Sequence, residues 1–268
     1  MEDMGTSIVL DCTFRDGGYK TDWRFNADQV GQHIAGTTAD VIEIGYRAAY
    51  SPECGEYRYC LDSHLDALRI PDHVRLAVMV NANEWTRDLF RPNSESRIDI
   101  VRVAAHLEAI PESVAIVRRL RNLGYFVALN IMQAHRAKDT VFDRGYGADV
   151  VYFADSFGCM SARQVARIVQ RLKRHNPRIG FHGHNNTGRA LSNTLVAQLN
   201  GATWLDASVG GIGRCAGNTD LADLLSSMGR SSGSNLADLS QGHTLRSRIV
   251  YGCSAILKMH PKRVEQWA

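Results

Sequence analysis

Residues 99–132, DIVRVAAHLEAIPESVAIVRRLRNLGYFVALNIM, contain one complete copy of the pattern that decides the fold. Apolar, β-branched runs at 99–104 and 125–132 predict two strands, and the stretch between them, 111–123, has the periodicity of a helix. That helix has a typical end, because arginines lie in its last turn, near the negative end of the helix dipole, and Gly124 follows. A strand, a helix and a second strand in this order predict a βα repeat with parallel strands.

The same alternation extends over most of the chain. Strands are predicted at residues 8–13, 41–45, 74–80, 99–104, 125–132, 150–154, 179–182 and 203–208. Helices are predicted at residues 27–37, 60–68, 84–90, 111–123, 138–145, 162–175, 188–199 and 218–228. Eight strand–helix pairs match an α/β fold of the (β/α)8 TIM-barrel type, which typically takes about 250 residues. A doubly wound open sheet is the structural alternative.

A polar segment, RSSGSN at 230–235, marks the predicted end of the barrel. We therefore expect a TIM-barrel catalytic domain over residues 1–230. The remaining residues, 231–268, are too few for a second domain, since domains typically have at least about 50 residues. They predict a short C-terminal helical extension that packs on the barrel or on a neighbouring subunit.

The overall composition excludes several classes of protein. The 268 residues are 44% hydrophobic and 22% charged, which is typical of globular domains and not of disordered or fibrous proteins. The formal net charge of +3 is too small to indicate binding to nucleic acid or to an anionic membrane surface. No apolar run approaches the roughly 20 residues that span a bilayer, and the N-terminus has no secretory signal. We therefore expect a cytoplasmic protein whose six cysteines are reduced thiols.

In a barrel the reactive groups lie on the loops after the strands, so the residues that follow each predicted strand are the most informative. The first such stretch, DCTFRDGG at 11–18, places Arg15 and Asp16 in a predicted glycine-ended turn. The second, FHGHNN at 181–186, places His182 and His184 on the same side of an extended segment. Two imidazoles and an aspartate from across the barrel mouth suit Mg²⁺, Mn²⁺, Co²⁺ or Zn²⁺. The alternative is that one histidine only hydrogen-bonds a carbonyl group.

A third stretch, GGIGRCAGN at 210–218, follows the last predicted strand and leads into a helix. A glycine-rich loop before a helix N-terminus can bind an anion, but a tight turn that closes the barrel would use the same residue types. The loop does not match a dinucleotide-binding motif, because it ends the series of strands instead of opening it. From the residues alone, the anion site and the closing turn both stay open.

These three stretches, in this order, resemble the DRE-TIM metallolyases, and the resemblance extends from about Ile8 to Leu225. Three further stretches, VIEIG at 41–45, ALNIM at 128–132 and FADSFG at 153–158, resemble the 4-hydroxy-2-oxovalerate aldolase branch of that superfamily. The resemblance implies a metal-dependent aldolase or lyase that forms or cleaves a carbon–carbon bond through the enolate of pyruvate or a related 2-oxo acid. Its small-molecule substrates would be a 2-oxo acid and an aldehyde.

The resemblance also implies roles for individual residues. Asp16, His182 and His184 would ligate the metal, with Mn²⁺ or Mg²⁺ expected first and Co²⁺ or Zn²⁺ as further candidates. Arg15 would stabilise the enolate oxygen, and Glu43 would complete the trio of Asp, Arg and Glu that is typical of the family. The residues expected to bind substrate are Arg15, Arg47, Asn130, Ser156 and Asn218, and Asn218 is an additional metal ligand in some relatives. Arg47 and Arg214 are candidate carboxylate clamps, or alternatively solvated charges at the rim.

The sequence departs from the aldolase branch at the general base. The family has a histidine shortly after the first motif, where this chain has Tyr19. We place Tyr19 among the catalytic residues as a proton relay or a positioning group, because a phenol is a poor base at neutral pH. His135, His243 and His260 are other candidates for the base. Cys215, which stands where the aldolases have a glycine, is interpreted as a packing or incidental residue and not as a catalytic thiol.

Two other functions stay open at this point. One is a Claisen-type acyltransferase that condenses acetyl-CoA with a 2-oxo acid, although the chain lacks the long C-terminal domains of most such synthases. The other is a non-catalytic barrel that binds a metal or a 2-oxo acid. We expect a homo-oligomer. The long aldolases of the branch carry a C-terminal extension that docks an acetaldehyde dehydrogenase; we do not expect that partner here, so the aldehyde need not be acetaldehyde.

Overall fold

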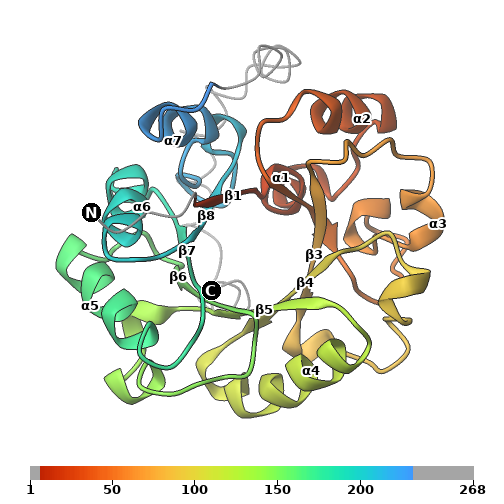
Figure 1. Ribbon diagram of the computed structural model, residues 1–268. Helices are drawn as coiled ribbons and strands as arrows, with labels where there is room; N and C mark the ends of the chain where they lie inside the picture. Colours follow the sequence, from red (N-terminus) through yellow and green to blue (C-terminus); the bar gives the residue numbers. More distant parts are fainter. Residues whose placement is uncertain (1–6, 232–268) are drawn as a thin grey trace, which may run out of the picture.

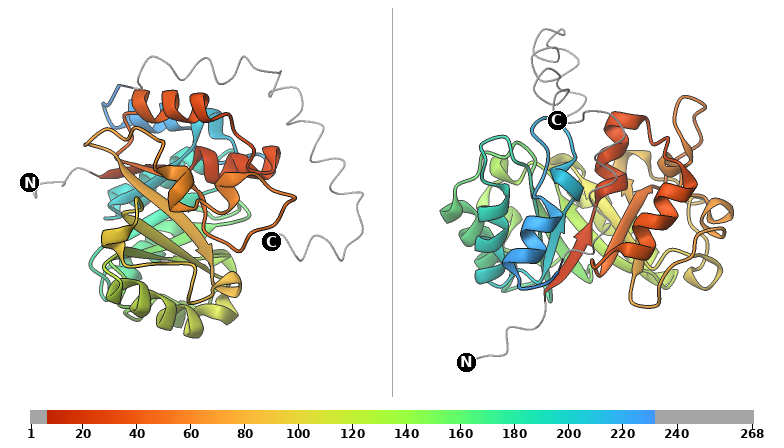
Figure 2. Two further views of the ribbon diagram at one scale, coloured as in Figure 1. Left: turned by 90° about the vertical axis from the view of Figure 1, so that its right-hand side faces the viewer. Right: turned by 90° about the horizontal axis from the view of Figure 1, so that it is seen from above.

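The computed structural model describes residues 7–231, which form a closed barrel of eight parallel strands in the order β1 to β8. The strands are β1 (Ile8–Asp11), β2 (Val41–Tyr46), β3 (Arg75–Asn81), β4 (Ile100–Ala105), β5 (Phe126–Ile131), β6 (Val150–Asp155), β7 (Ile179–Gly183) and β8 (Trp204–Ala207). Figure 1 looks along the barrel, and Figure 2 shows it from two further sides. All eight predicted strands are present. The TIM-barrel prediction is therefore confirmed, and the open sheet is wrong.

Seven α-helices lie within residues 7–231. They are α1 (Thr13–Thr21), α2 (Ala27–Gly36), α3 (Asp62–Leu65), α4 (Ile110–Asn122), α5 (Ala162–Leu172), α6 (Ala190–Leu199) and α7 (Leu221–Ser227). Short 3₁₀ turns are η1 (Glu56–Arg58), η2 (Ala82–Glu84), η3 (Asn93–Glu95), η4 (Leu107–Ala109), η5 (Ala134–Arg136), η6 (Asp139–Val141) and η7 (Val209–Gly211). Five predicted helices correspond to α2, α4, α5, α6 and α7, and the one predicted at 60–68 is a single turn, α3.

The extension predicted over 231–268 lies, beyond its first residue, outside the described residues. None of the helices in the described part of the chain is long and apolar enough to cross a membrane.

Two predicted helices are wrong. At 138–145 only the turn η6 forms. Glycines at 145 and 147 weaken a helix here, and the next backbone N–H group bonds to a side chain. The backbone N–H of Tyr146 donates to Asn176 Oδ1 (3.2 Å) instead of to a helical carbonyl. At 84–90 the helical turn η2 ends at Glu84, where Trp85 adopts an extended backbone and stacks its indole on Phe90 (5.6 Å between ring centroids).

The first chemical motif forms a helix, α1, and not the predicted turn. Figure 1 shows α1 closer to the barrel axis than α2. The Asp11 carboxylate accepts a hydrogen bond from the backbone N–H of Thr13 (2.9 Å), which helps to start the helix. Gly18 is needed for close packing, because a Cβ atom there would lie 2.0 Å from the indole nitrogen of Trp23. The two glycines that indicated a turn therefore allow a helix to lie inside the barrel mouth.

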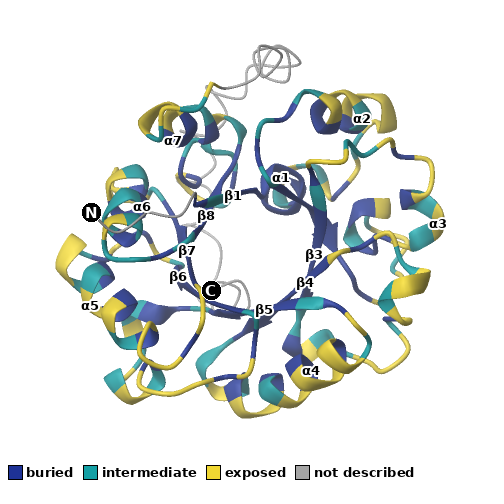
Figure 3. Ribbon diagram, viewed as in Figure 1, coloured by how far each residue is buried: buried dark blue, intermediate teal, exposed yellow. Residues whose placement is uncertain are grey.

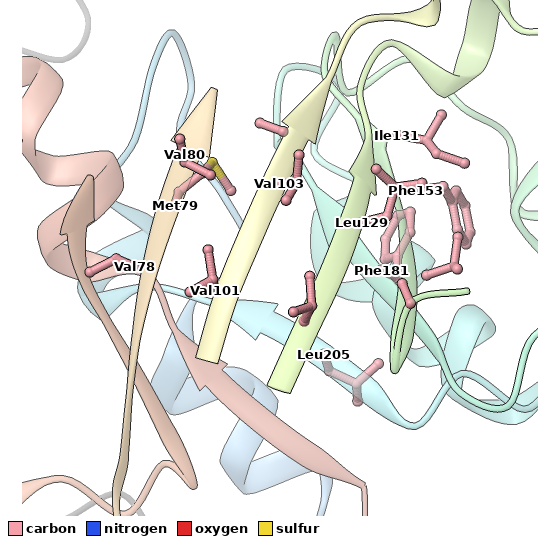
Figure 4. Packing of buried hydrophobic residues seen from close by; sticks show 14 of the residues in the cluster. Val78, Met79, Val80, Val101, Val103, Leu129, Ile131, Phe153, Phe181 and Leu205 are labelled. Atoms are coloured by element: carbon pink, nitrogen blue, oxygen red, sulfur yellow. The ribbon is translucent and has the colours of Figure 1, made fainter. Parts of the chain in front are cut away.

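Side chains that point into the barrel change character along its axis. At the N-terminal ends of the strands they form an apolar cluster that includes Leu10, Val41, Ala77, Ile100, Ala128, Val150 and Trp204. Buried polar residues follow on the same strand faces: Glu43, Arg102, Asn130, His182 and Asp206. The opposite strand faces carry apolar residues that pack under the helices (Figure 4), and the strands are buried while the outer helix faces are exposed (Figure 3). The polar groups thus collect toward the C-terminal mouth, where TIM barrels carry out their chemistry.

Candidate active site

The helix α1 brings Arg15 and Asp16 into the barrel mouth. Arg15 is 4% exposed and Asp16 is fully buried. The guanidinium of Arg15 donates through Nη1 to Asp16 and through Nε to Glu43 Oε2 (2.8 Å). Within residues 7–231, the Nη2 group of Arg15 is buried and has no hydrogen-bond partner. A buried donor without a partner is costly, so this nitrogen is suited to an anionic oxygen of a ligand.

Asp16 lies next to the residues that follow β7 and β8. Its Oδ2 atom is 3.6 Å from His182 Nε2 and accepts a hydrogen bond from Asn218 Nδ2 (2.6 Å). The rings of His182 and His184 are 5.0 Å apart between centroids, and His184 forms a backbone bridge to Asn218. The Oδ1 atom of Asn218 is buried without a partner. The structure therefore brings Asp16 and His182 together, and with Cys12 their ligand atoms all lie within 4.8 Å of one another. The ring of His184 lies beside that of His182, and Asn218 donates to Asp16.

The electrostatics of this group favour the forms that bind a metal. Burial alone would raise the pKa of Asp16, but Arg15 and His182 hold it well below its usual range. Burial, together with the neighbouring His182, lowers the pKa of His184 well below its usual value, so its imidazole is neutral. Burial and the Asp16 carboxylate raise the pKa of the nearby Cys12 thiol, which therefore stays protonated. The Asp16 carboxylate, the imidazoles of His182 and His184 and the amide oxygen of Asn218 are donor types that fit a divalent cation such as Mn²⁺, Mg²⁺, Co²⁺ or Zn²⁺.

A network of buried charged side chains connects His182 to Arg15. Asp206, on β8, accepts from His182 Nδ1 (2.9 Å) and from Arg102 Nη2 (2.6 Å). Arg102, on β4, also donates to Glu43 Oε2 (3.0 Å), which links back to Arg15. The hydrogen bond between His182 Nδ1 and Asp206 fixes the tautomer of His182 and leaves its Nε2 atom facing Asp16. Such a bond to the second ring nitrogen typically orients histidine ligands in metal sites. Arg102 and Asp206 were not predicted, although a charged residue at an inward position of an apolar strand was a usable signal.

A cavity of about 360 Å³ lies near this group. Its described lining includes none of the metal-binding side chains, but Tyr46 and Arg214 on its wall interact electrostatically with Asp16. Its lining includes Tyr19, Tyr46, Arg58, Glu84, Asn81, His106, Met132 and Arg214. The hydroxyl groups of Tyr19 and Tyr46 are hydrogen-bonded at 2.7 Å, and the Arg214 guanidinium lies 5.1 Å from the centre of the Tyr19 ring. Arg58 makes a two-pronged ion pair with Glu84, at 2.8 Å to each oxygen. The predicted catalytic residue Tyr19 and the predicted clamp Arg214 thus share this cavity wall.

The other predicted substrate residues lie apart from that wall. Arg47 donates to Asp62 Oδ2 (3.1 Å) and covers the ring of Phe90, and the described cavity lining does not include it. Asn130 is buried, with an Oδ1 atom that lacks a partner. Ser156 accepts a hydrogen bond from the backbone N–H of Gln133 (2.9 Å). Asn130 lies on β5 and Ser156 directly follows β6. Among the described residues, neither side chain forms a hydrogen bond to the Asp16 group.

The structure also describes His135, another candidate for the base, and Cys215, the cysteine of the glycine-rich loop. His135 packs against Phe157, with ring centroids 4.8 Å apart, and does not line the cavity. His243 and His260 lie outside the described residues. Cys215 is exposed and has a φ angle of 50°, in the left-handed region that favours glycine. A glycine at this position would adopt that backbone conformation without strain.

A closed (β/α)8 barrel with a buried arginine, a carboxylate and two histidines at its C-terminal mouth defines a class of metal-dependent TIM-barrel enzymes. The chain belongs to the HMGL-like family, whose model matches residues 7–249, and through it to the DRE-TIM metallolyase superfamily. Members of this superfamily depend on a divalent metal ion.

The chain is similar to curated aldolases over most of its length. It is 33% identical over 236 residues to 4-hydroxy-2-oxovalerate aldolase 2 of Nocardia farcinica, a match that covers 80% of this chain and 66% of the relative. It is 30% identical over 245 residues to 4-hydroxy-2-oxovalerate aldolase of Geobacillus genomosp. 3, covering 85% of this chain and 73% of the relative. The chain therefore spans about two thirds of the length of these relatives.

Solved structures share the fold. The N-terminal domain of a protein from Bacteroides vulgatus, assigned as an aldolase, superposes with a TM-score of 0.74 at 26% identity and covers 94% of this chain and 88% of that one. Hydroxymethylglutaryl-CoA lyase from Pseudomonas aeruginosa superposes with a TM-score of 0.72 at 19% identity, covering 93% of this chain and 98% of that one. At the lower identity, the similarity shows the fold alone.

Proposed function

We propose that the protein is a divalent-metal-dependent aldolase that forms or cleaves a carbon–carbon bond through the enolate of pyruvate or a closely related 2-oxo acid. The single observation that carries this proposal is the convergence of Asp16, His182 and Arg15 in a buried mouth, with Arg15 Nη2 left without a partner. The similarity to 4-hydroxy-2-oxovalerate aldolases supports the same reaction class.

Asp16, His182 and His184 would hold the metal, and Asn218 offers an additional oxygen. The carboxylate and amide oxygens suit Mn²⁺ or Mg²⁺, and the two imidazoles extend the set of suitable ions to Co²⁺ and Zn²⁺. When bound, the cation would supply Lewis-acid polarisation of the 2-oxo acid. Arg15 would donate from Nη2 to the oxygen on which negative charge develops, and Glu43 would hold that guanidinium in position. The buried surroundings exclude water, which strengthens these electrostatic contacts.

The aldehyde would occupy the neighbouring cavity. A volume of about 360 Å³ is several times larger than acetaldehyde needs, and its wall combines aromatic rings with polar groups, among them Asn81, Arg58 and Arg214. These features favour an aldehyde that is longer than acetaldehyde and carries hydroxyl or other polar groups. Arg214 is the better placed of the two candidate clamps, because it lies on this wall and Arg47 does not.

Proton exchange of pyruvate in D₂O tests the enolate chemistry without knowledge of the aldehyde. We expect the methyl proton signal of pyruvate to decline when the protein is loaded with Mg²⁺, or with Mn²⁺ that is chelated before each spectrum is recorded. Arg15→Ala should lower the exchange rate by about 100-fold or more, because it removes a donor to the developing anion. The absence of metal-dependent exchange in the unaltered protein would refute the proposed function.

A further inference from the structure

The inward side chains of β4 form a column along the barrel axis. Ile100 belongs to the apolar cluster, and Arg102 belongs to the buried charge network above it. Ala104 and His106 continue the same two-residue period, and both line the cavity near the metal-binding group. The small side chain of Ala104 leaves space on the cavity wall below His106. The alternation of side chains along β4 therefore places the His106 imidazole on the wall of the cavity in which the aldehyde would bind.

His106 is held at this position by its backbone. It immediately precedes η4, and its carbonyl oxygen accepts a hydrogen bond from the N–H of Ala109 (3.0 Å). Its side chain is partly exposed to the cavity. Within residues 7–231 its imidazole makes no hydrogen bond to protein, and the described cavity lining contains no second histidine. A fixed backbone with an uncommitted imidazole is suited to proton exchange with a ligand.

Glu84, Tyr46 and Tyr19, which also lie on this wall, are engaged with neighbouring side chains. Glu84 is neutralised by its two-pronged ion pair with Arg58. Tyr46 shares its hydroxyl group with Tyr19, and burial raises the pKa of Tyr46 well above its usual value, so this phenol is a donor and not a proton acceptor. His106 is consequently the proton-accepting side chain that this wall presents to a ligand.

We propose that His106 is the general acid–base residue for the aldehyde half of the reaction, a role that the sequence leaves without a residue once Tyr19 replaces the family histidine. In cleavage, the His106 imidazole accepts the proton of the C4 hydroxyl group. The O–H electron pair forms the aldehyde carbonyl, the C3–C4 bond breaks, and its electron pair passes to the enolate of pyruvate. A solvent proton then converts the enolate to pyruvate, and His106 returns its proton to water. In condensation, His106 donates the proton to the new hydroxyl group.

This inference rests on the proposed aldolase function, and two assays separate them. Pyruvate proton exchange measures enolate formation and does not involve the C4 hydroxyl group. Cleavage measures the complete reaction, followed as pyruvate release from 4-hydroxy-2-oxopentanoate and from 4,5,6-trihydroxy-2-oxohexanoate, whose aldehyde product is polar. His106→Asn and His106→Ala are compared with the unaltered protein and with His73→Asn, an exposed histidine that precedes β3 at the opposite end of the barrel.

We expect His106→Asn to cleave the better substrate at least about 100-fold more slowly while its exchange rate stays within about threefold of the unaltered protein, because general acid–base catalysis typically contributes 10²–10⁴-fold. Added imidazole should restore part of the cleavage by His106→Ala, which a merely structural role would not produce. His73→Asn should match the unaltered protein in both assays.

Three results would overturn the assignment to His106. They are cleavage by His106→Asn within about threefold of the unaltered protein, an equal fall of exchange and cleavage, and cleavage by His106→Ala that imidazole leaves unchanged. Failure of the unaltered protein in the exchange assay would instead reject the aldolase function itself. Thermal unfolding of each variant, compared with that of the unaltered protein, shows whether the substitution has affected folding.

Discussion

At the scale of single residues, Asp206 links the stability of the barrel to the orientation of a metal ligand. It accepts hydrogen bonds from His182 Nδ1 and from Arg102, and it is almost fully buried. Burial alone would raise the pKa of Asp206, but Arg102 and His182 lower it, so the carboxylate stays ionised. A charged partner on Nδ1 raises the basicity of the other ring nitrogen, Nε2, which faces Asp16.

Asp206→Asn should therefore weaken metal binding, although it leaves every proposed metal-coordinating side chain in place. We expect the affinity for Mn²⁺, measured by isothermal titration calorimetry, to fall by about 10- to 100-fold, as is typical when such a supporting partner is lost. Asp223→Asn, an exposed carboxylate on α7, is the matched control and should leave the affinity unchanged. Equal affinities of the two variants would show that Asp206 does not tune the ligand.

At the scale of elements, α1 depends on packing more than on intrinsic helix propensity. Its sequence, TFRDGGYKT, contains two adjacent glycines, which weaken an isolated helix. The helix is nevertheless buried from Thr13 to Gly18, and the indole N–H of Trp23 donates to the Arg15 carbonyl oxygen (3.1 Å). Sequence patterns could not predict this helix, because the interactions that stabilise it come from other parts of the barrel.

Two glycine substitutions test this account of α1. Gly18→Ala places a methyl group against the ring of Trp23, so we expect it to destabilise the protein by about 2–3 kcal/mol, the usual cost of overpacking. Gly31→Ala, within α2, meets no atom within 4 Å and should stabilise the protein by about 0.4–1 kcal/mol. Urea unfolding measures both. A Gly18→Ala variant as stable as Gly31→Ala would contradict the described packing of α1 on Trp23.

The connection of α2 to β1 is a buried ion pair that predicts a pH dependence. His33 Nε2 lies 2.6 Å from Asp11 Oδ2. Burial alone would lower the pKa of His33, but the Asp11 carboxylate raises it above the usual value of about 6.5. A raised pKa in the folded state stabilises the protein fully below the unfolded pKa, and this contribution is lost as the pH rises through the folded pKa.

The free energy of unfolding of the unaltered protein should therefore exceed that of His33→Gln most at about pH 6. The difference between the two should shrink steadily as the pH is raised above about 6.5. Urea unfolding at half-unit steps from pH 5.5 to 9 provides the measurement. A difference that stays constant over this range would mean that folding does not shift the pKa of His33, and a difference that shrinks as the pH falls below about 6.5 would mean that His33 is neutral in the folded protein.

At the scale of the whole molecule, the strands were the most predictable part. Strands of a closed parallel barrel are buried on both faces and appear in the sequence as short apolar runs, and all eight such runs form strands. The predicted ligands Asp16, His182 and His184 could be named because they lie at or shortly after the C-terminal ends of predicted strands. The pairing of Arg102 with Asp206 could not, since it joins residues 104 positions apart and depends on the closed register of the barrel.

Metal binding should stabilise the entire barrel, because its ligands come from both ends of the described chain. Asp16 lies just after β1, whereas His182 and Asn218 lie at β7 and after β8, and β1 and β8 form the seam that closes the barrel. Mn²⁺ at 100 times its dissociation constant should stabilise the fold by about 2.7 kcal/mol. Differential scanning calorimetry with and without EDTA measures this gain. His184→Ala should remove most of it, and an unchanged gain in that variant would place the metal elsewhere.

The buried charge network has a consequence for the ionic state of the ligands that the site accepts. Two guanidinium groups, of Arg15 and Arg102, face the three carboxylates of Asp16, Glu43 and Asp206. Carboxylates thus outnumber guanidinium groups by one in this set of ion pairs, and an anionic substrate that arrives first would meet an excess of acidic groups in a medium of low dielectric constant. A divalent cation would offset that excess and leave room for one further negative charge. We therefore expect the cation to bind before the acid, and monoanions to bind in preference to dianions at this position.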